Sequence, residues 1–77
     1  MMVELYTMDD CPWCEKAKKL LAFKKVEYVT YNISREPHSR AARIKRNPSY
    51  TKVPQTYVDD RFIGGYEELL KNSNLLF

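Results

Sequence analysis

The sequence has few of the residues that define special classes of protein. It contains two glycines and four prolines among 77 residues, which excludes a collagen-like or low-complexity chain. No apolar run approaches the roughly 18–20 residues needed to span a bilayer, so we expect no membrane segment. The first residues also lack the basic start and long apolar stretch of a secretory signal. Together with 44% hydrophobic residues, these absences predict a globular, cytoplasmic protein.

Cysteine is scarce too, because Cys11 and Cys14 are the only two. A disulfide between them would close a loop too short to stabilise a fold as the disulfides of small secreted domains do. A zinc site needs four ligands, and the chain offers only two thiols and one histidine. That histidine, His38, is distant in sequence, and we expect it on the surface of a helix. Zinc or an iron–sulfur cluster would need ligands from outside the chain, so we expect no bound metal or cofactor. Redox chemistry is the favoured interpretation, with two inert, buried cysteines as the alternative.

Positive charge is concentrated in one part of the chain. The net charge is +3, and residues 35–52 hold six lysines or arginines but a single acidic side chain, Glu36. Such a segment suits an anionic ligand, an acidic partner or nucleic acid, and equally a solvated helix face. No zinc-finger pairing, aromatic RNA-binding strand or helix-turn-helix accompanies it. We therefore expect no nucleic-acid partner.

Strand signals recur along the chain. Alternating, β-branched or aromatic residues predict strands over residues 3–7, 26–31, 55–58 and 61–63. The last two flank Asp59-Asp60, which predicts a hairpin although the favoured turn glycine is missing.

Helical signals separate and follow these strands. The first helix begins near Cys11, with Pro12 in the first turn, where a missing N–H does no harm. Ser34 can cap a second helix, which must end by Asn47 because a proline follows it. The third helix is expected to be short, over residues 66–71. The Asn-Ser-Asn of residues 72–74 should end it, so that the last three residues fold back as an apolar plug.

The expected order is β-α-β-α-β-β-α within a single domain of residues 1–77. A right-handed crossover should pair the first two strands in parallel, and the later hairpin should add antiparallel strands. The sequence therefore predicts an α/β fold, with a four-stranded mixed sheet flanked by three helices. The cysteines would lie where a strand leads into a helix, a place where α/β sheets position reactive groups.

The spacing of Cys11 and Cys14 suits thiol–disulfide exchange. The attacking species is a thiolate, and the unpaired N–H groups and dipole of a helix N-terminus favour negative charge on the Cys11 sulfur. Cys14 lies on the same helix face, so it can attack a mixed disulfide formed on Cys11. Pro12 and Trp13 stiffen the turn between them, and Trp13 adds an apolar surface beside the sulfur.

Three segments resemble the dithiol glutaredoxin family. Cys11-Pro12-Trp13-Cys14 resembles its CP[YF]C active site, residues 53–58 (VPQTYV) its TVPxxFV segment, and residues 63–69 (IGGYEEL) its IGGxxDL segment. Together these motifs span nearly the whole chain. The resemblance implies the thioredoxin fold, Cys11 as the nucleophile, and a cis bond before Pro54 that faces the sulfurs across a cleft.

The same resemblance implies a site for glutathione. The backbone of Val53 would pair with this extended peptide as a strand does, and Gly64-Gly65 would let the backbone approach it closely. The N–H groups of Glu67 and Glu68 would hold its γ-glutamyl carboxylate, and the Glu68 side chain its ammonium group. The implied glutathione-binding residues are Lys52, Val53, Gly65, Tyr66, Glu67 and Glu68.

The chain departs from the family pattern just before the active site. Many members carry a lysine there, whereas this chain has Met8-Asp9-Asp10. The two carboxylates oppose a thiolate, and we expect the helix N-terminus to outweigh them if they point to water. Lys52, where the family has threonine, is one replacement for the missing cation, with Arg43 or Arg46 as further candidates.

The leading interpretation is a monomeric, glutathione-dependent thiol–disulfide oxidoreductase. It would reduce protein disulfides and protein–glutathione mixed disulfides, with glutathione as the reducing co-substrate. The missing lysine favours an alternative, a dedicated electron donor to ribonucleotide reductase that is itself reduced by thioredoxin reductase. A metal- or cluster-binding module or a non-catalytic adaptor is a third hypothesis. Cys14 counts against it, because cluster-binding glutaredoxins more often have serine at that position.

Overall fold

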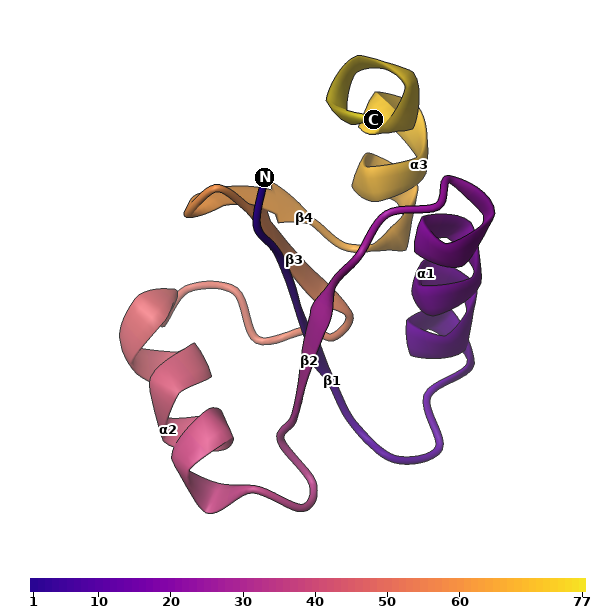
Figure 1. Cartoon of the computed structure of the whole chain (residues 1–77). Coiled ribbons are helices and arrows are strands. Elements are labelled where there is room, and N and C mark those ends of the chain that lie inside the picture. Colours follow the sequence, from indigo (N-terminus) through magenta and orange to yellow (C-terminus); the bar gives the residue numbers. More distant parts are fainter.

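A computed structural model describes all residues from 1 to 77 (Figure 1). Its elements follow the expected order β-α-β-α-β-β-α. No helix has both the length and the apolar character required to cross a membrane. The elements are β1 (Val3–Thr7), α1 (Pro12–Phe23), β2 (Val29–Asn32), α2 (Pro37–Arg46), β3 (Gln55–Val58), β4 (Arg61–Gly64) and α3 (Tyr66–Leu76).

The four strands form one mixed sheet with the order β2-β1-β3-β4. β1 pairs with β2 in parallel and with β3 antiparallel, so that Glu4 lies opposite both Val29 and Tyr57. β3 and β4 form the antiparallel hairpin. Figure 1 shows α1 and α3 on one side of the sheet and α2 on the other. The predicted four-stranded mixed sheet with three helices is confirmed.

The second strand is shorter than predicted, since it covers Val29–Asn32 rather than residues 26–31. Val26 instead belongs to the turn that ends α1, because its N–H bonds to the carbonyl of Leu21. Lys25 adopts a positive φ of 57° in this turn. Val26 is therefore a β-branched residue that packs against the core from a loop.

The predicted cap of the second helix was wrong, because Glu36 rather than Ser34 occupies the N-cap position of α2. The Ser34 hydroxyl instead accepts a hydrogen bond from the N–H of Asp9 at 3.0 Å. Glu36 Oε1 accepts from the N–H of Asn32 at 3.0 Å and from the Ser39 hydroxyl at 2.9 Å. The loop before α2 is therefore hydrogen-bonded to the β1–α1 loop through Ser34 and to the first turn of α2 through Glu36.

The third helix also differs from the expectation, because it runs on to Leu76. Two polar side chains that should end it bond back to helix carbonyls, from Asn72 to Glu68 and from Ser73 to Leu70. Such bonds let poor helix formers remain inside a helix. The last three residues do not fold back as a plug: Leu76 and Phe77 pack against the core, but Leu76 does so as part of α3, and Leu75 is exposed.

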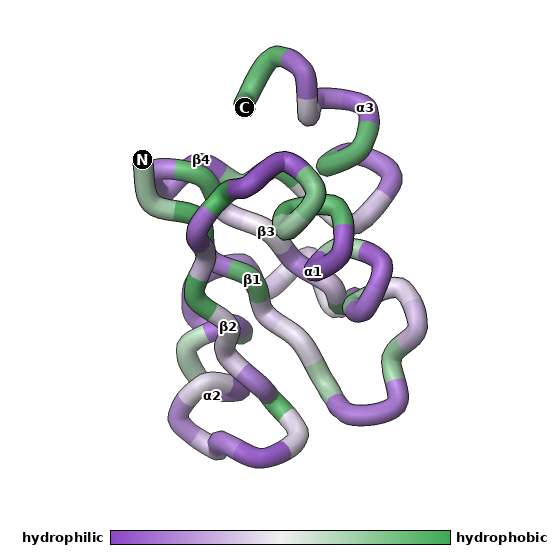
Figure 2. Tube along the Cα trace, turned by 45° about the vertical axis from the view of Figure 1, so that its right-hand side comes forward, coloured by the Kyte–Doolittle hydropathy of each residue, from purple (hydrophilic) through white to green (hydrophobic).

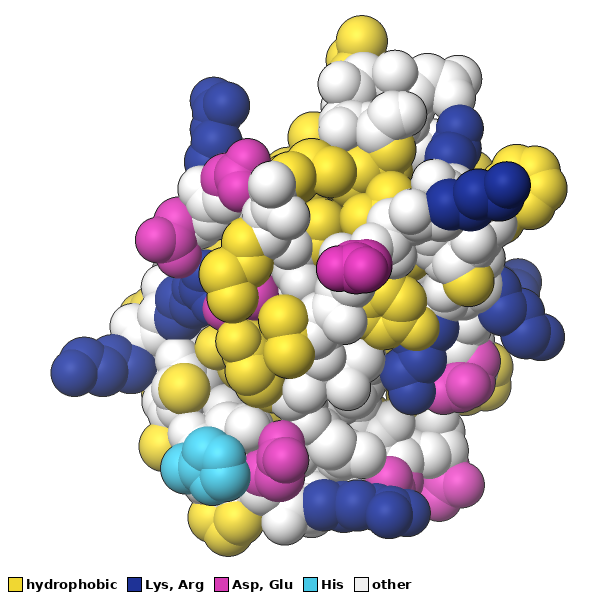
Figure 3. All heavy atoms as spheres, viewed as in Figure 1, with side chains coloured by type: hydrophobic (Ala, Val, Ile, Leu, Met, Phe, Trp, Pro, Cys, Tyr) yellow, Lys and Arg dark blue, Asp and Glu magenta, His cyan; other side chains and the backbone are white.

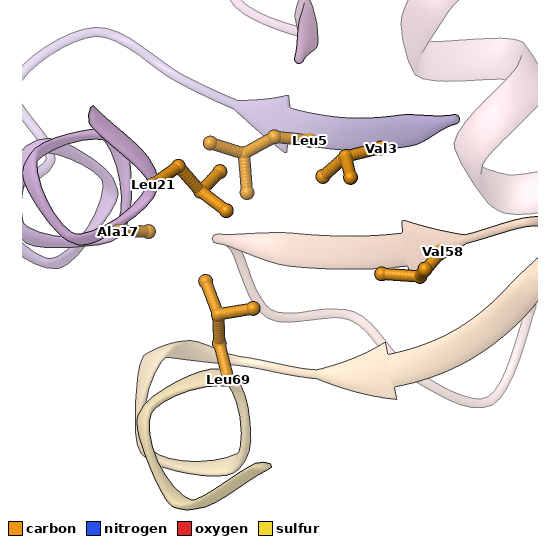
Figure 4. Close-up of a cluster of buried hydrophobic side chains, with 6 residues drawn as sticks. All are labelled: Val3, Leu5, Ala17, Leu21, Val58 and Leu69. Carbon is orange, nitrogen blue, oxygen red and sulfur yellow. The ribbon is translucent and has the colours of Figure 1, made fainter. Parts of the chain in front are cut away.

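The apolar core lies between the sheet and the α1–α3 pair. Figure 4 shows its six buried side chains pointing toward one another from four elements. Because both helices bury apolar residues against the same strands, their positions on the sheet are fixed together. The six are Val3 and Leu5 from β1, Ala17 and Leu21 from α1, Val58 from β3 and Leu69 from α3.

A polar and aromatic layer lies between the sheet and α2. The Glu4 carboxylate accepts hydrogen bonds from Arg46 Nη1 at 3.1 Å, from Arg46 Nη2 at 2.9 Å, and from the Tyr31 hydroxyl at 2.8 Å. Arg46 also donates to Asp60 at 2.6 Å. Its guanidinium lies 3.8 Å from the ring centre of Tyr57. This network joins the end of α2 to three strands and the hairpin turn.

Helix α2 is largely hydrophilic along its length (Figure 2), as suits a helix that contacts the sheet through this polar and aromatic layer. Hydrogen bonds from Arg46 hold the pKa of the Glu4 carboxyl below its ordinary value, although burial acts in the opposite direction. Ion pairing stabilises the charged carboxylate in a site where only 12% of its side-chain surface is exposed.

We predict that Arg46→Met lowers the free energy of unfolding at neutral pH by about 2 kcal/mol, because it leaves the buried Glu4 carboxylate without a positively charged partner. The pKa of Glu4 is lower in the folded than in the unfolded chain. The lost stability is therefore fully present above the ordinary pKa of a glutamate, and disappears as the pH falls through the lowered value. Urea denaturation between pH 7 and pH 3 measures both effects.

Arg40→Met, on the exposed part of the same helix and outside any ion pair, is the matched control and should change stability by less than about 0.5 kcal/mol. Equal effects of the two substitutions at every pH would contradict the structural role of the Glu4–Arg46 pair.

Candidate active site

Cys11 and Cys14 are joined by a disulfide at the start of α1, with their Cα atoms 5.2 Å apart. Cys11 is the N-cap of the helix, and its sulfur accepts a hydrogen bond from the Cys14 N–H at 3.2 Å. Pro12 occupies the first turn as predicted. The Cys11 sulfur therefore lies among backbone N–H groups that have no partner within the helix, and these stabilise negative charge.

The two cysteines differ in accessibility. Cys14 is completely buried, whereas Cys11 is half-buried and has surface open to solvent. An incoming disulfide can reach Cys11 but not Cys14. This geometry fits an attacking thiolate at Cys11 and a second thiol that meets only a partner already bound there.

The carboxylate of Asp9, which precedes the active-site turn, has hydrogen-bond donors of its own. It accepts hydrogen bonds from Asn32 Nδ2 at 3.0 Å and Arg35 Nε at 3.1 Å. These two donors hold the pKa of Asp9 below its ordinary value, the Asn32 bond being the larger cause. Asp10 is exposed. Of the two carboxylates expected to point to water, that of Asp10 belongs to an exposed residue, whereas that of Asp9 is paired with Asn32 and Arg35.

A cavity of about 350 Å³ lies beside the active-site turn. Its volume falls within the range of pockets that hold small ligands. All six residues that the sequence predicts for glutathione line it, so the fold brings them together from two separate segments, and Trp13 adds a third. The lining residues are Trp13, Tyr50, Lys52, Val53, Pro54, Gly65, Tyr66, Glu67 and Glu68.

Aromatic side chains join the cysteine turn to the start of α3. The rings of Trp13 and Tyr66 lie 5.7 Å apart, and the ammonium group of Lys16 lies 4.3 Å from the centre of the Trp13 ring. Trp13 keeps half of its surface exposed. The indole therefore forms a wall that an apolar part of a ligand can cover.

The opposite wall offers backbone groups. The Val53–Pro54 peptide bond is cis, as expected. The N–H and C=O of Val53 make no hydrogen bond within the chain, which leaves them for an extended peptide. At the start of α3, the carboxylate of Glu68 accepts from the N–H of Gly65 at 2.8 Å. The N–H groups of the next three residues, Tyr66, Glu67 and Glu68, have no helical partner, because the first helical bond runs from Leu69 to Gly65.

Sequence reasoning missed Tyr50, which also lines the cavity. No motif or periodicity marks it, because it lies in the irregular segment between α2 and Pro54. The structure places the two arginines proposed as replacement cations elsewhere: Arg46 is held by Glu4, and Arg43 donates to the carbonyl of Tyr50. Lys52 alone of the three candidates lines the cavity.

His38 lies on α2 and is exposed, as predicted; it is the cyan side chain in Figure 3. The structure has no group of three or more His, Cys, Asp or Glu side chains arranged to hold a metal ion. The same view shows lysine and arginine side chains spread around the rim of the molecule rather than gathered in one patch.

Comparisons with known proteins agree with this geometry. The glutaredoxin family model matches residues 3–63. The chain belongs to the glutaredoxin family. A probable glutaredoxin of Synechocystis is 40% identical over 67 residues, which cover 87% of this chain but 62% of that protein. Glutaredoxin 3 of Escherichia coli is also 40% identical over 67 residues, covering 87% of this chain and 80% of the relative.

The fold of this glutaredoxin agrees with that of solved relatives. Glutaredoxin 1 of Francisella tularensis superposes with a TM-score of 0.80 at 26% identity, over 96% of this chain and 93% of that one. This confirms the thioredoxin fold that the sequence resemblance implies. Glutaredoxins are thiol–disulfide oxidoreductases, and the disulfide-bonded Cys11–Cys14 pair places this chain in that enzyme class.

We predict that in the reduced protein iodoacetamide modifies Cys11 at least about tenfold faster than Cys14, because Cys14 has no exposed surface. Peptide mass spectrometry after substoichiometric labelling measures the ratio. The preference should disappear in concentrated urea, where both thiols are exposed. Faster labelling of Cys14 in the folded protein would contradict the assignment of the accessible sulfur.

Proposed function

We propose that this glutaredoxin is a glutathione-dependent oxidoreductase that reduces protein disulfides and protein–glutathione mixed disulfides. The observation that carries the proposal is the single cavity beside Cys11–Cys14, which gathers the six residues predicted to bind glutathione. It combines an aromatic wall, unpaired backbone groups and a helix N-terminus, which suit a small extended peptide with charged ends.

Glutathione would lie in the cavity as an extra strand, with its cysteine beside Val53 and its sulfur directed at Cys11. The γ-glutamyl carboxylate would accept hydrogen bonds from backbone N–H groups at the start of α3, where the helix dipole favours negative charge. Glu68 would hold the ammonium group, and Lys52 would supply the positive charge that is missing before Cys11. Trp13 and Tyr66 would cover the apolar part of the peptide.

Removal of glutathione from a protein needs only Cys11. Its thiolate attacks the glutathione sulfur of the mixed disulfide, so that a new S–S bond forms and the protein leaves as a thiolate, which takes up a proton. A second glutathione thiolate then attacks the sulfur bound to Cys11. This step forms oxidised glutathione and regenerates the Cys11 thiolate, so one free glutathione is consumed and the other half of the oxidised glutathione comes from the substrate.

Reduction of a protein disulfide needs both cysteines. Cys11 attacks one sulfur of the substrate and forms a mixed disulfide with it, releasing the other sulfur as a thiolate. The Cys14 thiolate then attacks the Cys11 sulfur, which forms the Cys11–Cys14 disulfide and releases the second substrate thiolate. The Cys11–Cys14 disulfide of the structure has the connectivity that this step would produce. Two glutathione molecules return it to the dithiol.

A second candidate is a dedicated electron donor to ribonucleotide reductase that thioredoxin reductase reduces. The observation in its favour is the β1–α1 loop, where Met8 stands before an Asp9 that is already paired with Arg35. This loop offers glutathione no cation. Turnover with glutathione plus its reductase, compared with turnover with thioredoxin reductase alone, separates the two candidates.

We predict that Cys11→Ser abolishes both activities. By contrast, Cys14→Ser keeps the removal of glutathione from proteins and loses the reduction of protein disulfides, because only the second reaction needs an internal attack. A glutathionylated peptide and a disulfide-bonded protein, each assayed with glutathione and its reductase, give the two rates. Full activity of Cys11→Ser on either substrate would show that the nucleophile is assigned wrongly.

Treatment of Cys14→Ser with oxidised glutathione provides a direct check of the attacked position. Mass spectrometry should show one glutathione, attached at Cys11. Cys11→Ser is the matched control and should remain unmodified, because its remaining thiol is buried. Modification of Cys14 at a similar rate would contradict the mechanism.

A further inference from the structure

Tyr50 is the one residue of the cavity lining that the sequence resemblance leaves without a role. Its hydroxyl group makes no hydrogen bond within the chain, while its backbone carbonyl accepts two. The hydroxyl retains some solvent access and lies next to Gly65. A polar group placed in a ligand cavity without a partner is available to a ligand.

The Tyr50 side chain is held in place before any ligand arrives. Its carbonyl accepts hydrogen bonds from the buried Arg43 guanidinium and from Gln55 Nε2, the latter at 3.2 Å. Its ring packs edge-on against Phe62, with 4.9 Å between the ring centres. Fixing both the backbone and the ring lowers the entropy lost when the hydroxyl engages a ligand.

Three oxygen atoms converge beside the Cα of Gly65. A Cβ at this glycine would lie 3.1 Å from the Tyr50 hydroxyl, 3.5 Å from Glu68 Oε1 and 3.6 Å from the Pro54 carbonyl oxygen. The carboxylate and carbonyl can only accept hydrogen bonds, and the hydroxyl can also accept. Burial, together with the negative charge of Glu68, raises the pKa of the Tyr50 hydroxyl, so it stays neutral. The cluster therefore suits a positively charged donor.

We propose that Tyr50 is a specificity-determining residue, whose hydroxyl accepts a hydrogen bond from the protonated α-amino group of the γ-glutamyl end of the thiol co-substrate. The same ammonium group would bond to Glu68 and to the Pro54 carbonyl. The inference rests on the proposed function, because it assumes that glutathione occupies this cavity. It adds that the enzyme selects thiols that carry an ammonium group at this position.

The α-carboxylate of the co-substrate is a poorer partner for Tyr50. A carboxylate next to the Tyr50 hydroxyl would also lie beside the negatively charged Glu68, which repels it. The carboxylate finds better donors in the backbone N–H groups at the start of α3. The two charged groups of one γ-glutamyl end therefore separate, with the carboxylate at the helix and the ammonium group at the Tyr50–Glu68–Pro54 oxygens.

The test compares two thiols on two forms of the full-length protein. Glutathione and glutaryl-cysteinylglycine, which lacks only the α-amino group, reduce the Cys11–Cys14 disulfide in wild type and in Tyr50→Phe. The fluorescence of Trp13, the only tryptophan, reports the rate of reduction. We expect Tyr50→Phe to lower the rate constant for glutathione about tenfold, as the loss of a hydrogen bond to a charged group does. The rate constant for the analogue should change less than about twofold.

Tyr28→Phe is the matched control. Tyr28 packs against the core and does not line the cavity, so its hydroxyl should not affect the reaction with either thiol. The comparison of the two thiols on wild type needs no variant, so it holds even if Tyr50→Phe is poorly folded. With the wild-type protein, glutathione should react at least about tenfold faster than the analogue.

Each outcome has one meaning. A tenfold loss for glutathione alone supports the role of Tyr50. Equal effects of Tyr50→Phe on both thiols, or no effect on either, would overturn that role. The proposed function would still stand as long as wild type reacts quickly with glutathione. Equal reactivity of the two thiols with wild type would overturn recognition of the amino group. A wild-type disulfide that glutathione does not reduce would overturn the proposed function itself.

Discussion

The redox chemistry depends on how α1 begins. At this point the chain has to provide an N-cap, and it uses a cysteine whose sulfur accepts a hydrogen bond from the Cys14 N–H. The group that caps the helix is therefore also the group that the helix N-terminus stabilises as an anion. Pro12 fits in the first turn because no helical hydrogen bond is needed there. One turn of backbone thus supplies the nucleophile, its stabilisation and the buried thiol that completes the exchange.

The two faces of the sheet carry different parts of this arrangement. On one face, an apolar core aligns α1 and α3, and the starts of both helices contribute to the same cavity through Trp13 and Gly65. On the other, Arg46 and Glu4 attach α2 through an ion pair and aromatic contacts. Arg43, also on α2, fixes the carbonyl of Tyr50, so this helix supports the cavity although no residue of α2 lines it.

Much of this could be predicted from the sequence because local signals and tertiary contacts agree. The CxxC turn has a strand before it and a proline in its first helical turn, so periodicity and capping rules place the sulfurs correctly. The errors come where specific hydrogen bonds and packing contacts override local propensity. Val26 packs in a loop, and Ser34 bonds to the β1–α1 loop. Helix α3 continues through residues 72–74 because the side chains of Asn72 and Ser73 bond back to helix carbonyls.

The cavity shows the limit of this reasoning. Its glutathione-binding residues could be named through short motifs, since those motifs constrain the backbone near the site. Tyr50 belongs to no motif, and its position depends on Arg43, Gln55 and Phe62, which are contributed by three separate elements. Contacts of that kind become visible only when the chain is folded.

The central claim is that glutathione binds in the cavity between the start of α1, the Val53–Pro54 turn and the start of α3. A crystal structure of Cys14→Ser joined to glutathione through Cys11 tests it most directly. The account predicts a strand-like peptide alongside Val53, with the γ-glutamyl carboxylate at the backbone N–H groups of Glu67 and Glu68. Glutathione extending over the outer surface of α2, with the cavity left to solvent, would contradict it.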